Sequence, residues 1–133
     1  MKESAVLARR MLDFACSKVE VGITTDEIDA LTHEEIVKNG AYPSPLNYAG
    51  FPKSVCTSVN EVACHGIPDD RPLQKGDVIA IDVSLFLNGF HGDNCGSVPV
   101  GISTDDSDTF QMKLINTTRE ALEKSISEIG PGM

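Results

Sequence analysis

The chain contains 133 residues (14.3 kDa), which is the size of a single compact domain. It has 11 basic and 20 acidic residues, a net charge of −9 and a pI near 4.6. This charge argues against nucleic acid or an anionic membrane surface as the main partner. Hydrophobic residues make up 41% of the chain, enough for a packed core, but no apolar run is long enough to predict a membrane span.

The first part of the sequence predicts two helices. Apolar residues recur at helical spacing over residues 3–19. Thr24 and Glu27 form a capping box that predicts a second helix over residues 25–38, with His33 on its solvated surface.

Cysteine use and the N-terminal pattern indicate an intracellular protein. Charged residues interrupt the first apolar stretch, so it does not resemble a secretory signal. The four cysteines lack the spacing of a CxxC motif, and we expect them to be free thiols.

The middle of the chain predicts a loop followed by antiparallel strands. Residues 42–52 contain three prolines and form an aromatic-bearing loop, and residues 53–60 read as a short strand. Alternating apolar residues predict a longer strand over residues 77–87. Asn88-Gly89 then indicates a type I′ hairpin with a return strand from Phe90 towards Val100, in which Gly96 and Pro99 predict a bulge or an edge.

A final helix is expected after this hairpin. Ser103 or Thr104 can cap it, and the following aspartates suit the positive end of the helix dipole. Its apolar stripe is predicted to consist of Phe110, Leu114, Ala121, Leu122 and Ile129.

The hairpin places two aspartates on one face of the sheet. With Asn88-Gly89 as the loop, Ser84 faces Asp93 and Asp82 is a diagonal neighbour of Asp93, with Cα atoms about 7–8 Å apart. No Lys or Arg lies in residues 77–101 to neutralise them. A divalent metal ion is the simplest compensation for two converging carboxylates. A solvent-exposed acidic face is the alternative.

Histidines supply further candidate site residues. His65 precedes a Gly-Ile-Pro turn that could hold its ring at the edge of a cleft, although a surface or purely structural histidine is the alternative. His91 faces Phe86 on the side of the aspartates, where it could approach the site or pack on the aromatic ring. Cys56 paired with His65 is a weaker, cysteine-hydrolase alternative, because no group is identified to orient the base.

Several long motifs together resemble type I methionine aminopeptidases. They are Tyr42-Pro43-Ser44-Pro45-Leu46-Asn47-Tyr48, Gly50-Phe51-Pro52-Lys53-Ser54-Val55-Cys56, Cys64-His65-Gly66-Ile67-Pro68-Asp69, Ile81-Asp82-Val83 and Asn88-Gly89-Phe90-His91-Gly92-Asp93. The resemblance is continuous from about Ala5 to Gly101 and strongest to the organellar branch, which implies a mitochondrial location, with the cytoplasm as the alternative.

The resemblance implies a fold and an activity. The fold would be α/β (α+β), the N-terminal half of a pita-bread (creatinase/aminopeptidase-like) fold with an antiparallel sheet and flanking helices. Residues 1–133 would form a single partial catalytic domain. The activity would be metal-dependent removal of the initiator methionine from nascent proteins, with two divalent metal ions (Co, Mn, Fe or Zn).

The resemblance also implies roles for individual residues. Asp82 and Asp93 match the family's bidentate and bridging metal ligands. His65 matches the histidine that contacts the substrate and helps stabilise the tetrahedral intermediate. The positions that line the pocket for the methionine side chain are matched by Tyr48, Phe51 and Cys56. Ser84 stands where the family usually has Thr, and residues 94–99 diverge from the family pattern.

The remaining family ligands, one histidine and two glutamates, have no match here. No histidine follows His91, and the glutamates of the final helix correspond to neither ligand. We therefore expect an incomplete metal site, no peptidase activity from this chain alone, and an exposed apolar surface that a second half would cover. The alternative function is a non-catalytic interaction protein built on the same half-fold, pairing with a second chain.

Overall fold

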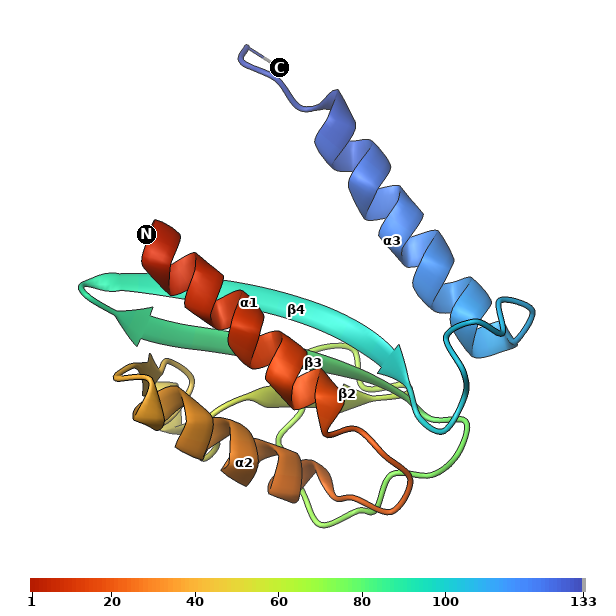
Figure 1. Cartoon of the computed structure of the whole chain (residues 1–133), viewed down its shortest axis with the longest axis horizontal. Coiled ribbons are helices and arrows are strands. Elements are labelled where there is room, and N and C mark those ends of the chain that lie inside the picture. The colour runs from red at the N-terminus through yellow and green to blue at the C-terminus, as the bar shows by residue number, and fades with distance from the viewer. Residues whose placement is uncertain (133) are drawn as a thin grey trace.

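The computed structural model describes residues 1–132, in which two helices cover one face of an antiparallel sheet (Figure 1). The elements are α1 (Lys2–Ser17), α2 (Thr25–Lys38), β1 (Tyr42–Pro43), the 3₁₀ turn η1 (Tyr48–Gly50), β2 (Cys56–Val59), β3 (Val78–Leu87), β4 (Phe90–Pro99) and α3 (Phe110–Glu128). None of the helices in this part of the chain is long and apolar enough to cross a membrane.

Strand β3 is the centre of the sheet. It pairs with β4 along its whole length, and β1 and β2 pair end to end with its other edge. Within that edge, Tyr42 lies opposite Phe86 and Cys56 opposite Asp82. The strand that carries Asp82 therefore lies between two neighbours.

The β3–β4 hairpin has the predicted register. Pairing runs without a bulge from Val78↔Pro99 to Leu87↔Phe90. Asn88 and Gly89 have φ values of 50° and 85°, the positive values that a type I′ turn requires. Gly96 marks an edge strand, as one of the two sequence alternatives predicted, and not a bulge.

The core lies between the sheet and α1 and α2. Alternate β3 side chains face these helices and are fully buried: Ile79, Ile81, Val83 and Leu85. The helices contribute Leu7, Ala8, Met11, Leu12, Ala15, Ile28 and Ile36. Because side chains alternate along a strand, Asp82 and Ser84 face the opposite, open side of the sheet.

The strand predicted over residues 53–60 is shorter than expected. The amides of Ser54 and Val55 donate to Asp29 Oδ1 at 2.7 and 2.9 Å, so pairing with β3 begins only at Cys56. The prediction that His33 is simply solvated is wrong, because its Nδ1 lies 2.8 Å from the hydroxyl of Ser54 in this segment. Residues 54–55 are thus fixed by α2.

Helix α3 begins later than predicted. Ser103 accepts a hydrogen bond from the Asp105 amide at its hydroxyl and from Asp106 at its carbonyl, which forms a turn instead of a helix start. Thr109 is the cap, and its hydroxyl accepts the Met112 amide at 3.3 Å.

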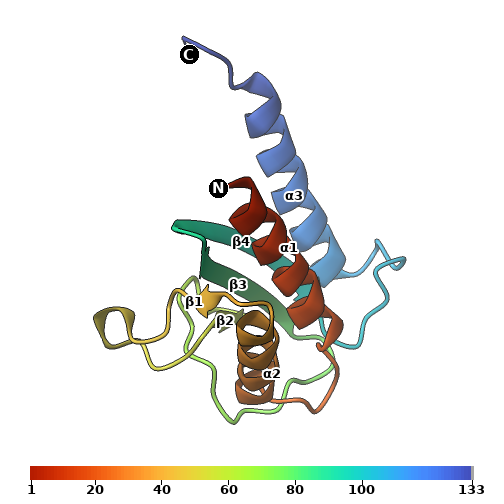
Figure 2. The same cartoon turned by 60° about the vertical axis from the view of Figure 1, so that its left-hand side comes forward.

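The predicted apolar stripe of α3 does not pack against the rest of the chain. The buried residues of α3 are Met112 and Ile115, which do not belong to that stripe. The exposed apolar residues of this segment are Phe110, Leu114, Leu122, Ile126 and Ile129. Figures 1 and 2 both show α3 projecting away from the sheet, and the expected exposed apolar surface therefore lies on this helix.

Candidate functional site

An open groove of about 680 Å³ lies on the side of the sheet opposite to α1 and α2. It is lined by Ser44, Pro45, Tyr48, Ala49, Gly50, Phe51, Pro52, Cys56, His65, Ile67, Asp82, Ser84, His91 and Asp93. All the site residues predicted from the sequence therefore line a single groove. They come from β2, β3, β4 and two loops.

The two aspartates lie side by side on the groove floor. Asp93 pairs with Ser84, two positions from Asp82 on the same face, as the hairpin register predicted. Burial of Asp82, with the nearby charge of Asp93, raises the pKa of Asp82 to about 6, while His65 acts in the opposite direction. The sheet thus holds a carboxylate whose negative charge is poorly compensated by the residues around it.

Ser84 connects the two strands at this point. Its hydroxyl donates a hydrogen bond of 2.7 Å to Oδ1 of Asp93. This contact fixes one carboxylate oxygen of Asp93. The serine therefore keeps the hydroxyl of the threonine that the resemblance led us to expect.

The donor chemistry of the aspartate pair fits a divalent cation. Two carboxylates with an unfavourable mutual charge are the oxygen ligands that such ions prefer. No group of three or more His, Cys, Asp or Glu side chains in residues 1–132 is arranged to hold a metal ion. Within these residues, the pair alone would supply only part of a coordination shell.

Cys56 lies directly opposite Asp82 across β2 and β3 and is buried. Burial, followed by the charges of Asp82 and Asp93, raises the pKa of the Cys56 thiol to about 11. The Cys56 thiol is therefore protonated at neutral pH, whereas a catalytic cysteine needs a lowered pKa. This environment argues against the cysteine-hydrolase alternative. Cys56 instead contributes a small apolar surface to the groove. All four cysteines are unpaired, as predicted.

Tyr48 and Phe51 form the aromatic side of the groove. Left-handed backbone at Asn47 and Ala49 bends the loop, and the Asn47 amide donates to the Phe51 carbonyl at 2.8 Å. Tyr48 is 78% exposed, whereas Phe51 is half-buried. The loop thus presents an apolar wall that remains open to solvent.

Ser44 and His91 form a further wall of the groove, and of the two only Ser44 was not singled out from the sequence. The Ser44 hydroxyl lies 2.8 Å from His91 Nδ1, and the ring of His91 packs against Phe86 in a tilted arrangement, with ring centroids 5.0 Å apart. Both sequence alternatives for His91 therefore apply, since it packs on the aromatic ring and lines the groove. The signal for Ser44 is absent from local sequence, because it depends on the two-residue pairing of β1 with β3.

The profile of metallopeptidase family M24 matches residues 1–133. The chain belongs to this family. It is 54% identical over its full length to methionine aminopeptidase 1D, chloroplastic/mitochondrial, of Arabidopsis thaliana, and covers 37% of that protein. The chain thus spans about a third of the length of this curated relative.

Solved structures show the same relationship. A methionine aminopeptidase from Rickettsia prowazekii is 43% identical, with a TM-score of 0.80 over 89% of this chain and 46% of its own. A methionine aminopeptidase from Thermotoga maritima is 30% identical, with a TM-score of 0.91 over 100% of this chain and 52% of its own. These M24 relatives confirm the predicted resemblance and the pita-bread assignment of the mixed fold.

Proposed function

We propose that this M24 chain supplies metal ligands and a methionine pocket for removal of the initiator methionine from nascent proteins. The observation that carries the proposal is that the groove combines the Asp82–Asp93 pair with an apolar aromatic wall. Residues 1–133 would form part of one catalytic domain. The activity and substrate are those named for its relatives.

In this proposal Asp82 and Asp93 hold divalent metal, and the expected set is two ions drawn from Co, Mn, Fe or Zn. When bound, the metal supplies Lewis acidity to the scissile carbonyl. Ser84 orients Asp93 through its hydrogen bond, so that the carboxylate is held in one position.

The remaining groove residues would bind and orient the peptide. Tyr48, Phe51 and Cys56 would contact the methionine side chain, because together they form an apolar surface. His65 would contact the substrate from the other side and help stabilise the tetrahedral intermediate. A mitochondrial or plastid location is proposed from the name of the Arabidopsis relative, with the cytoplasm as the alternative.

A second candidate function is a non-catalytic interaction protein that pairs with another chain. The exposed apolar residues of α3 favour it, since such a helix face is stabilised by a partner. The two functions differ in their use of the groove. We expect the 133-residue chain alone not to release methionine from a Met-Ala peptide, because two carboxylates cannot hold two catalytic ions.

Binding of methionine amide tests the groove directly. NMR titration in the presence of Zn²⁺ should shift the signals of Tyr48, Phe51 and Cys56, whereas glycinamide should not. Phe51→Ala should weaken the methionine response, and Phe110→Ala, on the exposed face of α3, should leave it unchanged. A response that is equal for the two amides, or that moves to α3, would argue against the methionine pocket.

A further inference from the structure

His65 has an unusual backbone conformation at the edge of the groove. Its φ is 52°, in the left-handed region that side chains other than glycine rarely adopt. The residue is exposed, as are residues 61–64 before it. Packing of the histidine itself therefore does not account for where it lies, and the constraint must come from its neighbours.

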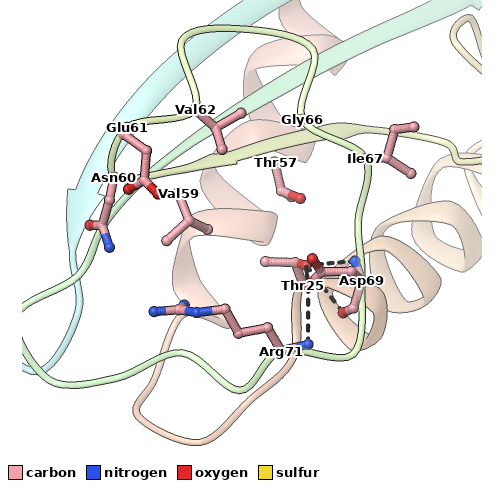
Figure 3. A pocket seen from close by; sticks show the side chains of 10 residues that line it. All are labelled: Thr25, Thr57, Val59, Asn60, Glu61, Val62, Gly66, Ile67, Asp69 and Arg71. Atoms are coloured by element: carbon pink, nitrogen blue, oxygen red, sulfur yellow. Dashed lines mark hydrogen bonds between the residues drawn. The ribbon is translucent and has the colours of Figure 1, made fainter.

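The next residue, Gly66, is hydrogen-bonded to β2 through both its carbonyl and its amide. Its carbonyl accepts the Thr57 amide at 2.9 Å, and its own amide donates to the Ser58 hydroxyl at 3.2 Å. A Cβ at position 66 would lie 2.1 Å from the Thr57 carbonyl oxygen. Gly66 thus lies directly against the backbone of β2, where Figure 3 shows it beside Thr57.

A second cavity of about 250 Å³ lies behind this contact (Figure 3). Its lining includes Thr57, Gly66, Ile67 and Asp69. The next anchor along the chain is Asp69, whose amide donates to the Thr25 hydroxyl at 2.8 Å. Because the connector between these anchors borders a cavity, the hydrogen bonds at Gly66 are the polar contacts that hold the His65 segment against β2.

We propose that Ser58 is a positioning residue for His65, acting through the Gly66 amide. Ser58 is 6% exposed, and it pairs with Ala80, so its side chain lies on the same face as Asp82. Its hydroxyl is the side-chain acceptor for the Gly66 amide. The role of Ser58 in catalysis rests on the proposed function, in which His65 contacts the substrate.

The backbone claim is tested with residual dipolar couplings of the full chain. In Ser58→Ala, the couplings of the His65 and Gly66 amides should fall at least two-fold while those of β3 remain unchanged. Ser58→Thr keeps the hydroxyl and should restore them. Ser4→Ala removes another buried serine hydroxyl, on α1, and should leave the His65 couplings unchanged.

Amide exchange of the wild-type chain provides a test that does not depend on a variant folding. The Gly66 amide should exchange at least ten-fold more slowly than those of residues 63–65. Equal exchange rates, unchanged couplings in Ser58→Ala, or an equal loss in Ser4→Ala would overturn the proposal.

Binding of methionine amide separates this proposal from the proposed function. In a titration in the presence of Zn²⁺, methionine amide should shift the His65 signals of the wild type and of Ser58→Thr. Ser58→Ala should reduce the shift at His65 at least two-fold while the shift at Phe51 stays unchanged. An unchanged His65 shift in Ser58→Ala despite altered couplings would overturn the positioning role. If the groove does not bind methionine amide at all, Phe51 and His65 will show no shift even in the wild type, and the proposed function fails instead.

Discussion

The hydroxyl of Ser84 donates a hydrogen bond of 2.7 Å to Oδ1 of Asp93 across the β3–β4 hairpin. It connects the central strand to the edge strand at the position of the proposed metal ligands. The conformation of Asp93 therefore depends on the neighbouring strand as well as on its own.

Replacement of Ser84 should weaken metal binding without unfolding the protein. Ser84→Ala removes the donor that orients Asp93, and loss of such a supporting hydrogen bond typically costs about 10–100-fold in metal affinity. Ser84→Thr keeps the hydroxyl and should bind Mn²⁺ like the wild type. Calorimetric titration of the two variants checks this, and equal affinities would show that the hydrogen bond does not orient the ligand.

The environment of Cys56 predicts an unreactive thiol. Because burial and the adjacent aspartates raise its pKa to about 11, iodoacetamide at pH 8 should modify the exposed Cys64 well before Cys56. Asp82→Asn removes one of the charges and should increase the reactivity of Cys56. Peptide mapping by mass spectrometry measures both rates. Preferential labelling of Cys56 in the wild type would revive the cysteine-nucleophile interpretation.

A partly buried ion pair beside β3 should make stability depend on acidic pH. Arg71 forms two hydrogen bonds to Asp77, and the side chain of Asn60 and the amide of Gln74 donate to the same carboxylate. With Arg71 as the main cause, these contacts lower the pKa of Asp77 from 3.8 to about 2. The stabilisation is therefore fully present above about pH 4 and is lost as pH falls through 2.

Asp77→Asn should cost about 2 kcal/mol at pH 7, and this difference should shrink towards pH 2. Asp13→Asn is the control, because Asp13 pairs with Arg9 on the exposed surface of α1. It should change the free energy of unfolding by less than about 0.5 kcal/mol. Urea denaturation of both variants across this pH range measures the effect, which would be refuted by a loss at Asp77 that is independent of pH.

Helix α1 crosses β4 so closely that Gly92 has no room for a side chain. A Cβ there would lie 2.3 Å from the Ser4 carbonyl oxygen, which is backbone and cannot rotate away. Gly92→Ala should therefore destabilise the fold by about 2–3 kcal/mol. At Gly96 the nearest atom is the flexible Leu12 Cδ2 at 3.4 Å, and Gly96→Ala should cost less than about 1 kcal/mol. Equal thermal shifts in the two variants would contradict this packing.

The sequence was sufficient to predict the hairpin and the aspartate pair. Asn88-Gly89 sets the register of a tight turn, and alternation then determines which face Asp82 shares with Asp93. Both inferences depend on neighbours in sequence, and the observed pairing of β3 with β4 confirms them.

Features that depend on distant contacts were not predicted. Asp29 on α2 accepts hydrogen bonds from the amides of residues 54–55, which shortens β2. Ser44 lies close to His91 only because β1 pairs with β3. Neither contact leaves a periodic pattern in the sequence. The start of α3 was misplaced for a local reason, since Ser103 caps a turn with the same hydrogen-bonding groups that cap a helix.

Metal binding by the aspartate pair is the central claim, and Mn²⁺ titration of the 133-residue chain tests it most directly. We predict weak binding by the wild type that is lost in Asp82→Ala and in Asp93→Ala. Asp105→Ala, which removes an exposed aspartate before α3, should bind like the wild type. Binding that is unchanged in the Asp82 and Asp93 variants, or tight binding of two ions by the wild type, would contradict this account of a partial metal site.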